Sequence, residues 1–193
     1  MSGCEGCAGR NREGRKRMDM LEILRKRRSI RKYTGEPVPE EALEKVLAAG
    51  LLSASSKGRK PWEFIVVRDR ERLKRMSRCR AGAAGMLEGA DCAVVVIGDE
   101  QKSDVWIEDC TIAMSNMHTM AASLGLGSCW IQGRSREAAE GGTTEDFLRT
   151  ILKFPENFRL EAILSLGMPA VKPAAYELET LPTDKVHREF FGG

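Results

Sequence analysis

Histidine and aromatic residues are scarce in this sequence. Among 193 residues there are only two histidines, His118 and His187, and they do not form a pair at the spacing of a zinc site. The Gly-x-Ser-x-Gly turn that carries the nucleophile of many serine hydrolases is missing too. The sequence therefore argues against metal-dependent hydrolysis and against a serine nucleophile of this kind, and it predicts no metal site.

Long apolar runs and paired cysteine motifs are also missing. No apolar stretch approaches the roughly 18 residues that span a bilayer, and the basic N-terminus is not followed by the apolar core of a secretion signal. The six cysteines lack the spacing of a disulfide framework, and several lie in apolar runs, where a free thiol behaves as a small hydrophobic group. We expect a cytoplasmic protein without a membrane partner.

The first 17 residues are small, polar and basic, and we expect them to form a disordered tail. Cys4 and Cys7 make a Cys-x-x-Cys there, but the second pair needed for a structural zinc site does not follow. Residues 18–193 have the size of a single domain. From Val171 onward the chain lacks a core of its own, and we interpret this part as an arm that wraps a partner subunit.

Helical and strand patterns are mixed along the domain without the regular alternation of a doubly wound sheet, so we predict an α+β fold. Helices are expected over 19–26, from Pro39 to about 51, and over 70–78, 104–124 and 144–153; strands are expected over 61–67, 92–98, 128–131 and 160–166. Asp19 and Glu22 have the spacing of a capping box at the first helix. The continuous apolar run 92–98 predicts a central strand that is covered on both faces.

The longest predicted helix, 104–124, is rich in alanine and methionine and carries few charges after Asp109. We therefore expect it to be buried on nearly all sides. Its methionines are interpreted as core or subunit-interface residues, and His118 as a core or interface histidine rather than a catalyst. The glycines at 125 and 127 are either an ordinary helix cap or a turn whose backbone amides approach a flat ring.

The most informative segment is 27–33, with the sequence RRSIRKY, at the end of the first predicted helix. Basic residues there complement the helix dipole, so a solvated helix end is one interpretation. The serine between arginines favours another, because guanidinium groups bind phosphate oxygens in pairs and a hydroxyl adds a donor. Nucleic acid is a rival partner, but the net charge is only +3 and the basic excess is local, so we expect no nucleic-acid binding.

Three segments in register carry a family resemblance. They are 27–33, the loop 55–64 with the sequence SSKGRKPWEF, and 125–131 with the sequence GLGSCWI, preceded by Asn116 in the long helix. In order and spacing the chain resembles the FMN-dependent nitroreductases from about Met18 to His187. The resemblance implies an α+β fold with a mixed sheet surrounded by helices, and an intertwined homodimer whose two FMN sites are built from both subunits.

The resemblance also implies a set of FMN-binding residues. They are Arg27, Arg28, Ser29, Arg31, Ser55, Ser56, Gly58, Lys60, Leu126, Gly127, Ser128 and Lys172. Arg27 and Ser29 would hold the phosphate and the ribityl chain, with Arg28 beside them, and Lys172 would be a late basic residue for the phosphate. Arg31 would approach the N1 and O2 edge of the flavin, where a cation stabilises the reduced ring.

The remaining residues of this set would meet the cofactor elsewhere. Ser55 and Ser56 would reach the phosphate end from the other subunit, and the backbone of 126–128 would lie at the flavin N5 edge. Gly58 and Lys60 stand where family members commonly have Asn and Gln, so the usual amide contacts are missing or replaced by charge. Because of this departure, the resemblance does not imply a particular substrate preference.

The implied activity is hydride transfer from NADH or NADPH to flavin N5 and then to an electrophilic small molecule, such as a nitroaromatic, a quinone or an enone. It needs no side-chain nucleophile, in agreement with the missing motifs. Two alternatives stay open. One is an FMN-binding electron carrier that takes electrons from a protein donor through the Cys4 and Cys7 tail; the other is a flavin-cleaving or dehalogenating enzyme of the same fold.

Overall fold

The computed structural model describes residues 19–193, which fall into two compact units. The smaller unit contains residues 19–27 and 174–193, with the helix α1 (Met20–Lys26) and two single turns of 3-10 helix, η3 (Leu178–Thr180) and η4 (Thr183–Lys185). Its two segments are joined by backbone, since the amide of Tyr176 donates to the carbonyl of Arg25 at 3.0 Å. The larger unit contains residues 28–173.

The predicted capping box at α1 is wrong. Asp19 occupies the N-cap position, but its side chain accepts no capping hydrogen bond. Glu22 instead pairs with Arg25 at 3.1 Å and with Lys26 at 3.4 Å, in the next turn of the helix. Oppositely charged side chains three and four residues apart lie on one face of a helix, and here they draw the carboxylate away from the N-terminus.

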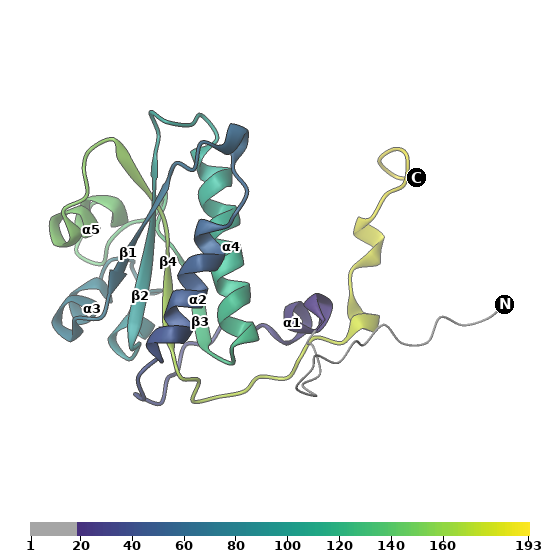
Figure 1. The fold of residues 1–193 in the computed structure, drawn as a ribbon, viewed down its shortest axis with the longest axis horizontal. Coiled ribbons are helices and arrows are strands. Elements are labelled where there is room, and N and C mark those ends of the chain that lie inside the picture. Colours follow the sequence, from purple (N-terminus) through teal and green to yellow (C-terminus); the bar gives the residue numbers. More distant parts are fainter. Residues whose placement is uncertain (1–18) are drawn as a thin grey trace. The chain divides into compact units, whose positions relative to one another are not determined.

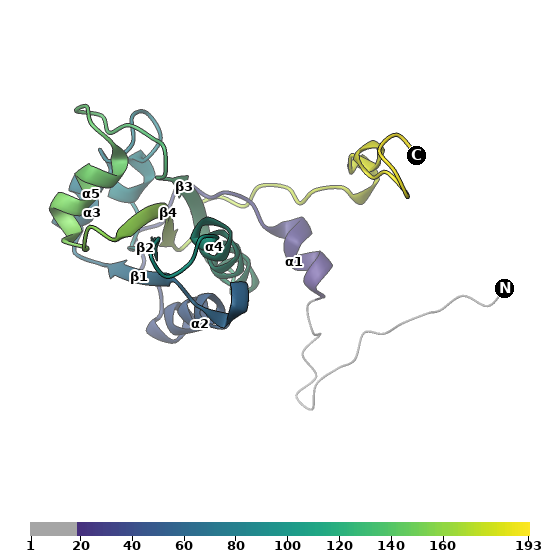
Figure 2. The same ribbon diagram turned by 90° about the horizontal axis from the view of Figure 1, so that it is seen from above.

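The larger unit is a four-stranded sheet with helices on both faces (Figures 1 and 2). The strands are β1 (Trp62–Val67), β2 (Cys92–Asp99), β3 (Gly127–Gln132) and β4 (Phe158–Gly167), and the helices are α2 (Glu40–Leu51), α3 (Arg70–Met76), α4 (Trp106–Ser123) and α5 (Thr144–Leu152). Two turns of 3-10 helix, η1 (Ser56–Gly58) and η2 (Gly85–Glu88), lie in the connections. The predicted α+β fold and the order of its elements are confirmed.

The strand order is β1-β2-β4-β3, and each neighbouring pair of these strands is antiparallel. The mixed sheet implied by the resemblance is therefore wrong for the described strands. The connections explain why neighbouring strands are antiparallel. Helix α4 carries the chain from β2 across to β3, so these two strands run in the same direction. Strand β4 lies between them and runs in the opposite direction to both. The edges of the sheet are β1 and β3.

Strand β2 separates two apolar cores. Val94 and Val96 face the core shared with α2 and α4, whereas Ala93, Val95 and Ile97 face the core shared with α3 and α5. This alternation confirms that the run 92–98 is a central strand covered on both faces.

The cysteines of the described residues are buried. Cys79, Cys92 and Cys110 are free thiols in these two cores, and Cys129 lies on β3. Burial raises the pKa of Cys79, Cys92 and Cys110 to about 12, so these thiols remain neutral at physiological pH. They behave as the small hydrophobic groups that the sequence predicts.

Helix α4 packs into the first core along one side only. Met114, Met117 and His118 are buried, but Ile112 is 41% exposed and Asn116 is exposed as well. The expectation of a helix buried on nearly all sides is therefore wrong for the single chain. Neither α4 nor any other helix within residues 19–193 is long and apolar enough to cross a membrane.

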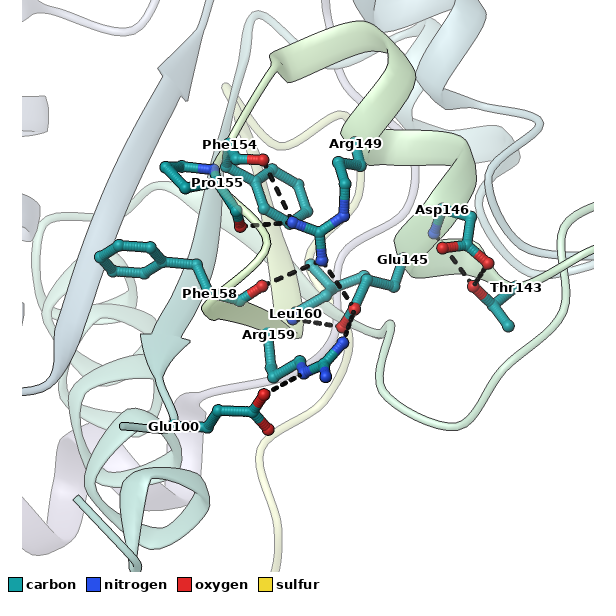
Figure 3. A network of polar contacts seen from close by, with 10 residues as sticks. All are labelled: Glu100, Thr143, Glu145, Asp146, Arg149, Phe154, Pro155, Phe158, Arg159 and Leu160. Carbon is teal, nitrogen blue, oxygen red and sulfur yellow. Dashed lines mark hydrogen bonds and ion pairs between the residues drawn. The ribbon is translucent and has the colours of Figure 1, made fainter. Parts of the chain in front are cut away.

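A network of charged residues fastens α5 to the start of β4 (Figure 3). The carboxylate of Glu145 accepts hydrogen bonds from Arg149 at 2.8 Å, from Arg159 at 3.1 Å and from the backbone amide of Leu160 at 2.8 Å. Arg159 also pairs with Glu100 at 2.8 Å. This network lies on the α5 side of the sheet, and none of its members is among the predicted cofactor residues.

Candidate cofactor site

The basic segment lies against the ends of β3 and β4. The amide of Ile30 donates to the carbonyl of Ser128 at 2.9 Å, and Ser29 forms a parallel bridge with Ser128. Further along, the amide of Thr34 donates to the carbonyl of Met168 at 2.9 Å. Two of the predicted cofactor segments, far apart in the sequence, are thus neighbours in the fold.

Tyr33 fixes the basic segment from the side of the sheet. Its hydroxyl lies 2.9 Å from the carbonyl of Ile30 and 2.7 Å from Oγ of Ser165 on β4. Burial raises the pKa of Tyr33 well above that of an ordinary phenol, so the hydroxyl keeps its proton. Its ring packs on Gly167 so closely that an added Cβ there would lie 2.6 Å from a ring carbon.

Gly127 allows the same close approach on β3. A Cβ added at this residue would lie 2.9 Å from the side chain of Ile30 and 3.2 Å from the carbonyl of Gly167. Before it, the amide of Leu126 donates to the carbonyl of Ala121 at 2.9 Å. This bond belongs to an ordinary C-cap of α4, so the amide of Leu126 is already used.

Basic side chains surround this junction. Arg28 is half-buried, and Arg31 and Lys32 are exposed. The carbonyl of Lys32 accepts a hydrogen bond from the amide of Ala170 at 3.0 Å, and Lys172 follows two residues later and is exposed. Guanidinium, ammonium and hydroxyl donors are the groups that bind phosphate, so this donor set fits a phosphorylated cofactor.

Arg27 belongs to the smaller unit, where it caps α1 and its amide donates to the carbonyl of Ile23 at 2.8 Å. Cys4 and Cys7 lie outside the described residues. Within residues 19–193 no group of three or more His, Cys, Asp and Glu side chains is placed to hold a metal ion.

The structure adds His118 to the candidate site. Nδ1 of His118 lies 2.7 Å from Oγ of Ser128, and both residues are buried, at 7% and 2% exposure. The sequence does place His118 on a core-facing helix, but nothing in its neighbourhood along the chain indicates Ser128 as its partner. The pairing is visible only once β3 is known to run beside the end of α4.

The loop that contains Ser55, Ser56, Gly58 and Lys60 lies at the other end of α4, where Asp109 holds it. The amide of Ser56 donates to Oδ1 of Asp109 at 2.8 Å, and Oγ of Ser103 donates to Oδ2 at 3.2 Å. Asp109 is 2% exposed, so its carboxylate is a buried anchor. The sequence signal that would have singled it out is a carboxylate on the core-facing side of α4, next to the exposed Glu108.

The same loop has an unusual backbone. Lys57, Gly58 and Lys60 have positive φ angles of 52°, 65° and 48°, a region that costs energy for residues other than glycine. Oγ of Ser55 accepts from the amide of Lys60 at 3.0 Å and closes the loop. Asn116 of α4 donates to Oγ of Ser53 at 2.8 Å and fixes its beginning.

Within the larger unit, Ser29 lies beside Ser128 near the C-terminal end of α4, and Ser56 lies beside Asp109 near its N-terminal end. The helix advances about 13 Å between Asp109 and His118, at 1.5 Å per residue. Two shallow hollows of about 420 and 550 Å³ lie along the segment 133–136, and neither is lined by a predicted cofactor residue.

Comparison with known proteins gives consistent matches. The model of the nitroreductase family matches residues 24–81 and 75–168. A protein of Archaeoglobus fulgidus, whose name assigns it to the NADH dehydrogenases and NAD(P)H nitroreductases, is 38% identical over 176 residues, which are 89% of this chain and 98% of that protein.

Solved structures agree with this match. An FMN-dependent nitroreductase of Clostridium difficile R20291 has a TM-score of 0.86 and 45% identity, covering 89% of this chain and 99% of that one. A nitroreductase-type protein of Desulfovibrio desulfuricans, solved in complex with FMN, has a TM-score of 0.68 and 26% identity, covering 84% and 92%.

Proposed function

Because the chain belongs to the nitroreductase family, we propose that it is an FMN-dependent oxidoreductase that passes hydride from NADH or NADPH to an electrophilic small molecule. The acceptor class is a nitroaromatic, a quinone or an enone. The observation that carries the proposal is the junction at Ser128, where the basic segment and the glycine segment are joined by backbone. The FMN-dependent and NAD(P)H-dependent relatives support the choice of cofactor and electron donor.

In this proposal the larger unit supplies phosphate binding and electrostatics. FMN, when bound, supplies the hydride chemistry through its N5. Arg28, Ser29 and Lys172 bind the phosphate, and Arg31 places a positive charge at the N1 and O2 edge, where it stabilises a reduced ring. The assignment of Arg27 to the phosphate remains a prediction from the sequence.

We further propose that two copies of the chain build each cofactor site, with Ser55, Ser56, Gly58 and Lys60 contributed by the second copy. The separation of the two clusters along α4 supports this, because one flavin would otherwise have to meet both ends of the helix. The outward stripe of α4, which includes the half-exposed Ile112, offers apolar area for an interface. A cytoplasmic location, where NADH and NADPH are abundant, fits this function.

The visible absorption spectrum tests the proposal directly. The purified protein is titrated with FMN and then mixed anaerobically with NADH and, separately, with NADPH. We expect a bound flavin band that bleaches with at least one of the two donors. A protein that stays colourless at saturating FMN would refute the function, and a bound flavin that neither donor reduces would leave an FMN carrier fed by another protein.

A further inference from the structure

A buried carboxylate lies at the larger of the two hollows beside the segment 133–136. It belongs to Glu161 on β4, and only 3% of this residue is exposed. Its neighbours along the strand, Leu160 and Ala162, are buried apolar residues. The hollow has a volume of about 550 Å³, within the usual range for a small-molecule site. A charged group at this depth costs free energy unless its oxygens are paired, so its partners decide what it can bind.

The partners of Glu161 leave one carboxylate oxygen without a hydrogen bond. Oε1 accepts a long hydrogen bond of 3.4 Å from Nε2 of Gln132. Oε2 lies 3.3 Å from Nε of Arg134, but no group within residues 19–193 is in hydrogen-bonding geometry to it. Burial raises the pKa of the Glu161 carboxyl, although Gln132 and Arg134 both act against this. The carboxylate therefore retains the capacity to accept from further N–H donors.

Arg134 covers the second oxygen from the rim of the hollow. Its side chain is 42% exposed, so water competes with Glu161 for the guanidinium. An ion pair with one solvated partner contributes little to stability. A ligand that offers N–H donors to Glu161 can therefore take the place of Arg134 at a small cost in free energy.

The other walls of the hollow favour a flat ring. Trp130 and Ile107 supply apolar surface. The indole N–H of Trp130 donates to Oε1 of Gln132 at 3.0 Å, and Nε2 of Gln132 donates to Glu161. This chain of hydrogen bonds holds the indole ring close to the carboxylate. An aromatic wall beside a carboxylate suits a flat ligand whose edge carries N–H groups.

We propose that this hollow binds a flat ring bearing a cationic pair of N–H donors, such as an amidine or a protonated aminopyrimidine, and that Glu161 recognises it. The two N–H groups match the two carboxylate oxygens, as a guanidinium does in a bidentate pair. The ligand displaces Arg134, which stays solvated at the rim next to the exposed Arg136. The proposal does not depend on the proposed function, because no predicted cofactor residue lines the hollow.

Benzamidine is the probe, and benzoate is the control with the same ring and the opposite charge. The full chain, isotope-labelled and in the presence of FMN, is titrated with each compound by NMR. The indole N–H signals of the three tryptophans are followed, and Trp130→Phe identifies the signal of Trp130. We expect benzamidine to shift this signal until the site is saturated and benzoate to leave it unchanged.

Two variants are expected to change the affinity for benzamidine in opposite directions. Glu161→Gln keeps the shape of the side chain but removes its charge, and it should weaken binding about tenfold. Arg134→Ala removes the competing cation and should strengthen binding roughly fivefold. Arg72→Ala is the matched control, since Arg72 is an exposed arginine of α3 that does not line the hollow, and it should leave the affinity unchanged.

The proposal is refuted if benzamidine leaves the Trp130 signal in place. Equal binding of benzoate would refute it too, because the arginines rather than Glu161 would then select the ligand. Weaker binding in Arg134→Ala would show that the arginine is a ligand of the site and not a competitor. A gain of affinity in Arg134→Ala cannot come from unfolding, so the test remains decisive even if Glu161→Gln lowers the stability of the protein.

Discussion

The two ends of α4 hold their parts of the candidate site in different ways. At the Ser128 end, the basic segment is joined to the sheet by backbone hydrogen bonds, from Ile30 to Ser128 and from Thr34 to Met168. At the other end, the loop 53–60 is held by side chains, with Asp109 as the buried anchor. The first arrangement depends on close packing, and the second depends on single polar residues.

This difference predicts where substitutions will be tolerated. Backbone bonds form with any residue that fits sterically, so the Ser128 end should be sensitive to bulk at its glycines, where Tyr33 and Ile30 pack closely. The loop contains Lys57 and Lys60 at positive φ, which is held only while its anchors remain. Each of the following experiments would sharpen the contrast or remove it.

The largest effect is expected at Gly167. A Cβ in Gly167→Ala would lie 2.6 Å from the ring of Tyr33, so either the ring or the strand must move. We expect a loss of about 3 kcal/mol in the free energy of unfolding, measured with urea. Gly85→Ala is the matched control, because a Cβ there meets no atom within 4 Å, and its effect should stay within about 0.5 kcal/mol. Equal effects of the two substitutions would show that close packing does not build this end.

Removal of the anchor at the opposite end comes next. Asp109→Ala leaves the amide of Ser56 and the hydroxyl of Ser103 without their acceptor, and we expect a loss of about 2.5 kcal/mol. Amide hydrogen exchange should quicken in the loop 53–60 while the core strand β2 stays protected. Asp109→Asn keeps an oxygen for Ser56 and should lose less. Unchanged exchange in the loop of the alanine variant would remove Asp109 as its anchor.

The elements of the fold are largely predictable from local sequence. β2 was recognisable because an apolar run of strand length has few other structures available, and the cores on both of its faces confirm this reading. The strand order was not recognisable, because β4 lies between β2 and β3 in the sheet although it follows both of them in the sequence. Glu22 failed as a capping residue for a similar reason, since two nearby cations competed for it.

The site is predictable only in part for the same physical reason. The sequence motifs identified the basic segment and the glycine segment, and in the structure these two segments meet at Ser128. Asp109 accepts a hydrogen bond from Ser56, and His118 is hydrogen-bonded to Ser128. No local sequence pattern indicates these partners, because each bond joins two elements that meet only in the folded chain. Residues that position a site are therefore found from the fold, whereas residues that bind a charged group are found from the sequence.

Subunit mixing tests whether the two ends serve one cofactor. Arg31→Ala, at the Ser128 end, should weaken FMN binding by about 2 kcal/mol, or roughly 30-fold. Lys60→Ala, in the loop, should weaken it less. A heterodimer with one variant of each kind carries both lesions in one site and none in the other, if each site takes one end from each copy. We expect FMN titration of the tagged, purified heterodimer to recover half of its sites at wild-type affinity. If both ends served the cofactor from one copy, no site would recover.

The smallest effect is a gain at Gly58, where the amide common in the family is missing. A Cβ at this position meets no atom within 4 Å, and asparagine tolerates the positive φ of 65° better than most residues. We expect Gly58→Asn to tighten FMN binding by about 1 kcal/mol, measured by the same titration. Gly58→Ala is the control, since it has the strain of a side chain without the amide, and it should bind FMN no better than wild type. If Gly58→Asn behaved like Gly58→Ala, the loop would not approach the flavin closely enough for an amide contact, and only its basic groups would remain as ligands.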